Sequence, residues 1–190
     1  MAYYSSDELK ELNFRSLGTD VKISNKASFY DCEKISIGDY SRIDDFCIVS
    51  GEVSIGRFVH ITPMCLIAGG IPGVIISDFC TLAYGVKIFA QSDDYSGNTM
   101  VGSLIPKNFK NETFSSVKMN RQVIVGTNSV VMPGVEIGEG CSFGAMTLIN
   151  KSTAAWGIYV GSPCKRIKER SKKMLELENV FIKDTLSDKF

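Results

Sequence analysis

The sequence contains few of the side chains that most often bind metals or act as bases. Among its 190 residues there is a single histidine, His60, and none of the six cysteines stands in a CxxC pair. Close, repeated spacings of Cys and His are the usual signature of a zinc site, and that signature is missing. We therefore expect no metal site, and we expect the cysteines to be reduced thiols.

Net charge and long apolar runs are missing as well. The 21 basic residues balance the 21 acidic ones, so no long-range field favours nucleic acid or an anionic membrane as the partner. No run approaches the roughly 18–20 apolar residues of a membrane span, and the opening MAYYSSDELK has no apolar signal-peptide core. These absences predict a cytoplasmic protein, without a membrane span, that acts on small molecules. Its length and its 44% hydrophobic content suit one domain, residues 1–190.

What the sequence does contain is an aliphatic residue at every sixth position. The pattern slips by three residues at GGIPG and is interrupted by one polar segment, and thirteen of its fifteen positions are Ile, Leu or Val. A period of six is typical of short strands joined by tight turns, three strands to each coil of a solenoid. The fifteen positions are Ile37, Ile43, Val49, Ile55, Ile61, Ile67, Ile76, Leu82, Ile88, Met119, Val125, Val131, Ile137, Phe143 and Ile149.

A second set of small or β-branched residues lies four positions after members of the first. Its cysteines behave as compact apolar fillers of a core, and glycines that directly follow the first set, such as Gly38 and Gly56, provide either a positive φ or close backbone approach. The sequence therefore predicts an all-β fold, a parallel β-helix with an aliphatic ladder on its axis. The second set is Ser41, Cys47, Val53, Val59, Cys65, Cys80, Val86, Val123, Ser129, Val135, Cys141 and Thr147.

The two ends and the interruption depart from the repeat. Ser5 and Glu8 form a capping box, which predicts a short helical cap over residues 1–16. The β-helix is expected over 17–160, opening with a looser coil and broken by an extended loop over 92–118. Near-helical spacing of apolar residues after Pro163 predicts a C-terminal helical tail over 161–190.

Three segments carry a family resemblance. The loop motif SDDYSG, the run VGTNSVVMPGVEIGEG and the closing GIYVGSPCKRI resemble the left-handed β-helix acyltransferases that contain hexapeptide repeats. The similarity is strongest to the branch that N-acetylates dTDP-4-amino-4,6-dideoxyglucose in O-antigen and nucleotide-sugar biosynthesis. This resemblance implies a homotrimer that uses acetyl-CoA and a sugar nucleotide, with active sites in the clefts between subunits. A loop that leaves one column could then complete the wall of a neighbour's site.

The acetyl transfer that the resemblance implies needs a nucleophile with its lone pair free and donors for the developing oxyanion. Asp94 and Asp93, in the loop, are candidates to orient a sugar amine and to stabilise the charge that forms on its nitrogen, and we favour Asp94. The alternative is a local turn held by the Asp side chains. His60 is a candidate base or substrate ligand, and otherwise a surface imidazole beside a turn.

The resemblance also suggests which residues contact the two substrates. Tyr84, Lys87, Tyr95 and Asn98 are candidates for sugar-nucleotide binding, although relatives are often acidic at the place of Asn98. Backbone amides at Gly144 and Ala145 resemble the positions that bind the pantetheine arm of CoA and that serve as oxyanion donors. The adenine and 3′-phosphate end matches Ser162, Pro163, Lys165 and Arg166, whose two cations could instead belong to a solvated helix start.

Proteins with this fold have other functions, of which two are alternatives to N-acetyl transfer and one is excluded by the sequence. O-acetyl transfer is the first alternative, but this loop lacks the histidine that many O-acetyl relatives carry there as a base. A scaffold without activity is the second, and it gives no reason for the polar loop or for GSPCKR. The zinc carbonic anhydrases of this fold need three histidine ligands from two subunits, which one histidine per chain cannot supply.

Overall fold

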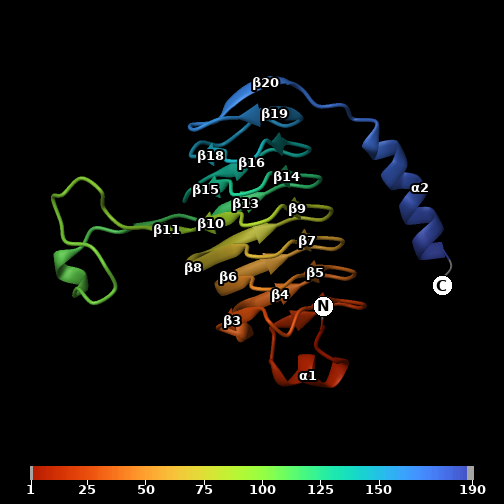
Figure 1. Cartoon of the computed structure of the whole chain (residues 1–190), viewed down its shortest axis with the longest axis horizontal. Coiled ribbons are helices and arrows are strands. Elements are labelled where there is room, and N and C mark those ends of the chain that lie inside the picture. The colour runs from red at the N-terminus through yellow and green to blue at the C-terminus, as the bar shows by residue number, and fades with distance from the viewer. Residues whose placement is uncertain (1, 188–190) are drawn as a thin grey trace.

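Short parallel strands stack in register to form a three-sided column (Figure 1). The structure is a computed structural model and describes residues 2–187. The first face of the column consists of β2 (Lys22–Ile23), β5 (Arg42–Ile43), β7 (His60–Ile61), β9 (Thr81–Leu82), β14 (Ile124–Val125), β17 (Ser142–Phe143) and β19 (Gly157–Val160). The predicted left-handed parallel β-helix is confirmed.

The other two faces form one continuous sheet, because two long strands bend around the corner between them. These are β6 (Ile48–Ile55) and β8 (Leu66–Ile76). The second face joins β3 (Ser28–Tyr30), β10 (Lys87–Phe89), β15 (Val130–Val131) and β18 (Leu148–Ile149) to the first halves of β6 and β8. The third face joins β1 (Ser16–Leu17), β4 (Ile35–Ile37), β13 (Val117–Met119) and β16 (Glu136–Ile137) to their second halves.

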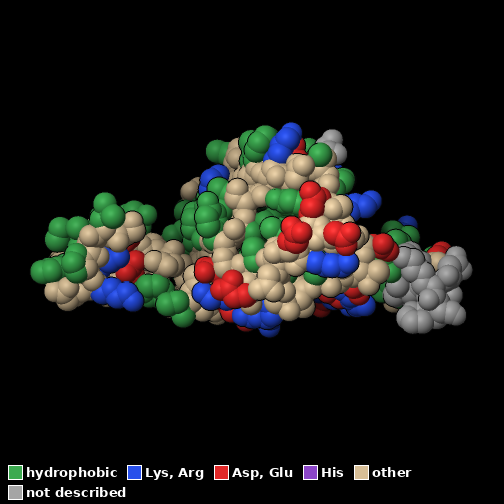
Figure 2. Space-filling view, turned by 90° about the horizontal axis from the view of Figure 1, so that it is seen from below, with side chains coloured by type: hydrophobic (Ala, Val, Ile, Leu, Met, Phe, Trp, Pro, Cys, Tyr) green, Lys and Arg blue, Asp and Glu red, His purple; other side chains and the backbone are tan. Residues whose placement is uncertain are grey.

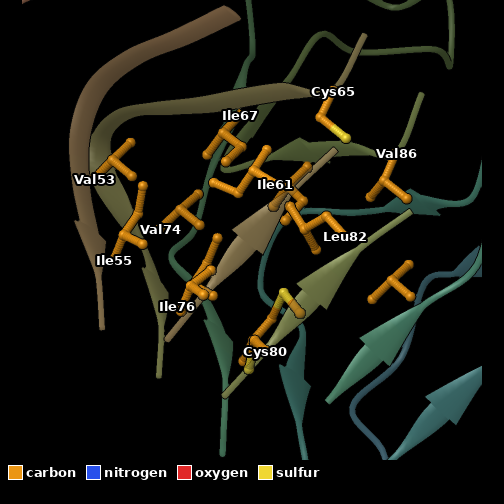
Figure 3. Packing of buried hydrophobic residues seen from close by; sticks show 14 of the residues in the cluster. Val53, Ile55, Ile61, Cys65, Ile67, Val74, Ile76, Cys80, Leu82 and Val86 are labelled. Carbon is orange, nitrogen blue, oxygen red and sulfur yellow. The ribbon is translucent and has the colours of Figure 1, made fainter. Parts of the chain in front are cut away.

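The core lies where the six-residue period predicts it. All fifteen residues of the first set are at most 4% exposed, and all twelve residues of the second set are at most 2% exposed. Figure 3 shows members of both sets, among them Ile61, Leu82 and Cys65, converging on the axis from successive coils. The four predicted cysteine fillers, Cys47, Cys65, Cys80 and Cys141, are buried free thiols. Burial raises the pKa of the Cys80 thiol to about 12, so it stays protonated at neutral pH.

Close backbone approach, rather than a positive φ, explains the glycines after the aliphatic residues. A Cβ on Gly38 would lie 2.6 Å from the carbonyl carbon of Gly56 in the next coil. The left-handed conformation falls two residues later, at Tyr40 (φ 58°), Phe58 (φ 55°) and Phe79 (φ 59°). Their rings stack at centroid distances of 4.8 and 5.0 Å and form a ladder outside the corner between the third and first faces.

The cap at the beginning of the chain is shorter than predicted. Helix α1 (Ser6–Glu11) begins with the predicted capping box, in which Ser5 and Glu8 bond to each other's backbone amides. The helix ends before residue 16 because Ser16 already pairs with Ser36 in the third face. The opening coil places Ile23 fully in the core and leaves Leu17 and Phe29 partly buried.

The predicted helical tail over 161–190 is wrong in its first part. Residues of β20 (Lys165–Glu169) turn back and pair antiparallel with β19, so they cover the last open strand edge of the first face. Helix α2 follows only at Met174–Ser187, and the last three residues of the predicted tail lie outside the described residues. Glu178 of α2 is paired with Arg121 of the column, and the Phe181 ring meets Phe58 edge to face.

An arm projects from the column where the polar loop was predicted (Figure 1). Its neck is the antiparallel pair β11 (Gln91–Ser92) and β12 (Thr113–Phe114), and a short 3-10 turn, Lys107–Phe109, lies beyond it. A second such turn, Cys32–Lys34, lies in the opening coils. The predicted loop end at 118 is two residues too late, because buried Val117 already begins β13 and pairs with Val74 in the third face. None of the helices in the described chain is long and apolar enough to cross a bilayer.

Candidate functional site

Several predicted site residues lie along one corner of the column, between the first and second faces. We call residues 62–65, 83–86, 126–129 and 144–147 the Tyr84 corner. Backbone hydrogen bonds connect its coils: the amide of Gly85 donates to Pro63 (3.1 Å), that of Asn128 to Tyr84 (2.8 Å) and that of Met146 to Thr127 (2.8 Å). The corner therefore aligns the predicted sugar-binding Tyr84 with the predicted CoA-binding segment at residues 144–145, two coils further along the column.

Tyr84 lies within this corner, and Lys87 follows the corner at the start of β10 in the second face. The Tyr84 side chain is 53% exposed, so its ring and hydroxyl are open to a ligand. Lys87 begins β10, beside Leu66 in β8, and its Nζ donates to the backbone oxygen of Gly85 at 3.0 Å. The ammonium is thus folded back onto the corner, where it places a positive charge close to Tyr84.

The two amides predicted as oxyanion donors have different environments. The Gly144 N–H donates to the carbonyl of Tyr159 at 2.9 Å as part of the strand ladder, so Gly144 is wrong as an oxyanion donor. The Ala145 residue is exposed, and its N–H has no hydrogen-bonding partner within residues 2–187. The sequence motif predicts a turn at these residues, but it does not show which backbone amide of the turn is hydrogen-bonded to the next coil. The Ala145 amide alone keeps the predicted donor role.

His60 lies on the first face, one coil before Tyr84, and it contacts a carboxylate that sequence reasoning missed. Its Nε2 is 2.9 Å from Oδ2 of Asp44, whose other oxygen accepts a 2.6 Å hydrogen bond from Nε of Arg42. The length of one coil could have predicted this contact from the sequence. His60 follows Arg42 by eighteen residues, one full coil, and the two are direct neighbours in the parallel ladder. Any outward residue two positions from Arg42 is therefore within reach of His60.

The paired carboxylates of the arm hold local turns. Asp94 accepts hydrogen bonds from the Ser96 amide (2.8 Å) and from the hydroxyls of Ser96 (2.9 Å) and Thr99 (2.8 Å). The Ser96 amide and then these hydroxyls stabilise the charged form and lower the pKa of the Asp94 carboxyl. Asp93 accepts a long 3.4 Å hydrogen bond from the Gly102 amide. The turn interpretation is thus correct for the isolated chain, and it leaves Asp94 ionised and half-buried.

The remaining arm candidates point outward. Tyr95 is 90% exposed. Asn98 is exposed too, and its backbone N–H donates to the Ser96 hydroxyl at 3.1 Å. The arm stands clear of the column that carries β7, and therefore clear of His60 in the same chain (Figure 1). The hydrogen-bond partners that the described residues offer Asp94 and Asp93 all lie in the arm, and none of them belongs to the Tyr84 corner.

The predicted phosphate-binding residues lie at the far end of the column. Ser162 and Pro163 form the turn between β19 and β20, and exposed Lys165 and Arg166 begin β20. Arg166 pairs with Glu169 at 2.7 Å, whereas Lys165 has no ion pair in the part of the chain that the structure describes. The two cations belong to a strand, so their alternative interpretation as a solvated helix start is wrong.

Two hollows in the described part of the chain are lined by residues outside the Tyr84 corner. One of about 1020 Å³ lies between α1 and the first coils and is lined in part by Lys10, Phe14 and Arg42. Another, of about 360 Å³, lies beside the base of the arm near Ile71 and Phe114. The Tyr84 corner is a convex edge, and a convex edge encloses a small ligand only when a second surface covers it.

The repeats and the complete chain match known proteins. Residues 116–151 match the family described as bacterial transferase hexapeptide (six repeats). The chain is 41% identical over 190 residues to the dTDP-4-amino-4,6-dideoxy-D-glucose acyltransferase of Escherichia coli, covering 99% of both chains. It belongs to the hexapeptide-repeat acyltransferases. A chloramphenicol acetyltransferase of Klebsiella aerogenes, 30% identical over 75% of this chain and 60% of its own, is a more distant member.

Solved structures of this acyltransferase family include one with nearly the same fold. AntD, an N-acyltransferase from Bacillus cereus, was solved with dTDP and 3-hydroxybutyryl-CoA; its TM-score is 0.95 at 44% identity, covering 96% of this chain and 97% of that one. A variant of AntD was solved with dTDP-4-amino-4,6-dideoxyglucose and coenzyme A. Two other AntD structures carry an alanine or an asparagine in place of an aspartate.

Proposed function

We propose that this acyltransferase moves the acyl group of an acyl-CoA, with acetyl-CoA as the expected donor, to the amine of dTDP-4-amino-4,6-dideoxyglucose. The carrying observation is the full-length similarity to two proteins named for this chemistry, at 41% and 44% identity. The bound dTDP-4-amino-4,6-dideoxyglucose and coenzyme A in the AntD variant support the same pair of substrates. N-acyl transfer is favoured over the O-acetyl alternative because AntD is an N-acyltransferase.

The reaction forms one bond and breaks another at the thioester carbonyl. The sugar nitrogen attacks the carbonyl carbon, a C–N bond forms, the C–S bond breaks, and the nitrogen loses a proton while the thiolate of CoA gains one. Asp94 is suited to orienting the amine and stabilising positive charge on it, because the lowered pKa keeps this carboxylate charged. The same lowered pKa makes Asp94 a weak base, so we assign it an electrostatic role. Asp93 is a secondary candidate in the same loop.

The residues proposed to bind the two substrates lie along the Tyr84 corner, in an arm and at the far end of the column. Tyr84 and Lys87 are proposed to contact the sugar nucleotide, together with Tyr95 and Asn98 of an arm. The Ala145 amide is proposed as the oxyanion donor, because it faces outward without a partner among the described residues. Pantetheine would then run along the corner past Gly144. Ser162, Pro163, Lys165 and Arg166 are proposed to hold the adenine and the 3′-phosphate, which two cations suit.

A homotrimer would bring an arm to the Tyr84 corner of a neighbouring copy. Tyr95 and Leu104 are 90% and 95% exposed, and Figure 2 shows hydrophobic side chains gathered on the arm. Large apolar side chains clustered on a projecting segment mark an interaction surface. We expect sedimentation equilibrium to give three times the chain mass of 20.9 kDa. A monomer at micromolar concentration would contradict both the assembly and a site shared between subunits.

The chemistry is tested by comparing an amine acceptor with its hydroxyl analogue. Purified enzyme is given acetyl-CoA or 3-hydroxybutyryl-CoA, with dTDP-4-amino-4,6-dideoxyglucose or with dTDP-6-deoxyglucose, and free thiol is measured. We expect thiol release with the amino sugar and at least about 10²-fold less with the hydroxyl sugar, because a hydroxyl needs a base during attack that the arm does not supply. Faster thiol release with the hydroxyl sugar would favour O-acyl transfer. No thiol release with either sugar would favour a scaffold without activity.

The proposed substrates also suggest where the enzyme works. A soluble sugar nucleotide and an acyl-CoA are both intracellular metabolites, so we propose a cytoplasmic location. An N-acylated dTDP-sugar is an activated glycosyl donor, which fits the supply of O-antigen or a related surface polysaccharide.

A further inference from the structure

A narrow neck joins the arm to the column. Its strands, β11 and β12, pair over two residues each, and beyond them the arm stands away from the column (Figure 1). The amide of Ser115 adds a further bond across the neck, to the carbonyl of Ala90 at 3.0 Å. A two-stranded ribbon of this size is at best marginally stable in water. Backbone pairing alone therefore does not fix the angle at which the arm leaves the column.

Side chains of the neck provide a second connection, which centres on Glu112. Its Oε1 accepts a 2.8 Å hydrogen bond from Nε2 of Gln91, at the start of β11. Its Oε2 lies 3.0 Å from Nζ of Lys110. The Lys110 and Glu112 side chains are only 7% and 13% exposed, although most of the arm around them is open to solvent. This ion pair is therefore screened less than an ordinary surface pair, and the loss of one partner leaves the other charge unpaired.

Gln91 connects this network to the column. Gly70 lies in the bend of β8 with a φ of 53°, and a Cβ placed there would lie 3.4 Å from Oε1 of Gln91. The Gln91 amide group thus lies against the bend while its nitrogen donates to Glu112. Lys110 and Glu112 also line the hollow of about 360 Å³ beside Ile71, so the ion pair borders the same bend. One side-chain network links the column, the neck and the arm.

The angle of the neck determines where Asp94 lies. Asp94 follows the end of β11 by two residues, and hydrogen bonds from Ser96 and Thr99 hold its carboxylate within the arm. A change of angle at the neck therefore moves this carboxylate together with the arm. A misplacement of about 1 Å in a reacting site can cost about 10²-fold in rate.

We propose that Glu112, through Gln91, fixes the angle between arm and column and so positions Asp94 for the sugar amine. This proposal rests on the proposed function, and in a trimer the amine is bound at the Tyr84 corner of a neighbouring copy. Glu112 acts without touching the substrate, because it limits how far the arm swings. Its loss lowers the fraction of enzyme in which Asp94 is in place, while the binding of acetyl-CoA, which is assigned to the column, is unaffected.

Steady-state kinetics provide the first test. Glu112→Ala removes both neck contacts, and we expect it to lower kcat about tenfold with little change in the KM for acetyl-CoA. Glu112→Gln retains an acceptor for Gln91 and should recover part of the loss. The matched control is Glu136→Ala in the third face, because Glu136 likewise accepts hydrogen bonds from a lysine, Lys118, and from an amide, both at 3.1 Å. This control should leave kcat and KM unchanged.

Combination with Asp94→Asn separates positioning of Asp94 from general stabilisation of the arm. If Glu112 acts through the charge of Asp94, Glu112→Ala should lower kcat less than about twofold once residue 94 is asparagine. The same tenfold loss in both backgrounds would overturn the proposal, because Glu112 would then act independently of Asp94.

Hydrogen–deuterium exchange of the neck gives a readout that does not depend on the substrate. We expect the amides of residues 91–92 and 113–115 to exchange faster in Glu112→Ala than in the wild type or Glu136→Ala, while the coils of the column keep their rates. Unchanged exchange of the neck in Glu112→Ala would overturn the proposal whatever the substrate. If the neck exchanges faster but the wild type does not acylate the amino sugar, the proposed function is wrong and the role of Glu112 in holding the arm stands.

Discussion

Asp94→Asn is expected to lower kcat/KM for the sugar nucleotide by about 10²-fold or more. Asparagine keeps the shape of the side chain and can still accept the hydrogen bond from the Ser96 amide, but it removes the charge that the turn stabilises. The loss then measures the electrostatic contribution to attack by the amine. Initial rates of thiol release at varied sugar concentration provide the measurement.

Controls separate the charge of Asp94 from its turn. Ser96→Ala removes a hydroxyl that donates to Asp94 at 2.9 Å while the carboxylate remains, so it should cost less than about tenfold. His60→Asn should also be milder than Asp94→Asn. A nearly active Asp94→Asn together with an inactive His60→Asn would move the catalytic assignment to the column and make the arm a substrate wall, and O-acyl transfer would regain support.

Ile137→Asp is expected to destabilise the fold by about 4 kcal/mol or more, because it buries an unpaired carboxylate in the axial ladder. The Ile137 side chain is 0% exposed and lies between Met119 in β13 and Thr153 in the next coil. Neither neighbour offers the charge or the set of donors that an ionised aspartate needs. Chemical unfolding followed by circular dichroism measures the loss.

The matched control places the same aspartate on the outside of the column. Ile124 begins β14 and is 39% exposed, so Ile124→Asp should change the free energy of unfolding by about 1 kcal/mol or less. Equal stability of Ile137→Asp and the wild type would mean that the register of the repeat is wrong. Equal destabilisation by both variants would mean that burial is not the cause.

The column could be predicted from sequence because each part of it is specified locally. A strand of two or three residues, a tight turn and one inward aliphatic side chain recur within six residues. The repeat alone therefore predicted twenty-seven inward residues, and all of them are buried. Free thiols such as Cys47 and Cys141 fitted the same rule, because the rule concerns size and not chemistry.

What could not be predicted depends on contacts that the repeat does not encode. Residues KRIKE in β20 have the composition of a solvated helix, but the unpaired edge of β19 turns them into a strand. The amide of Gly144 has the sequence context of a donor, but the ladder uses it to bind Tyr159. Asp44 is an unremarkable aspartate in sequence, and only the stacking of one coil on the next places it against His60.

Identification of the acylated atom in the product tests the central claim most directly. The enzyme is incubated with acetyl-CoA and dTDP-4-amino-4,6-dideoxyglucose, and the purified sugar nucleotide is analysed by mass spectrometry and two-dimensional NMR. The account predicts one acetyl group, linked as an amide to the nitrogen on C4, with the sugar hydroxyls unmodified. An acetyl ester on a sugar hydroxyl, or recovery of the amino sugar unchanged in the presence of folded, trimeric enzyme, would contradict it.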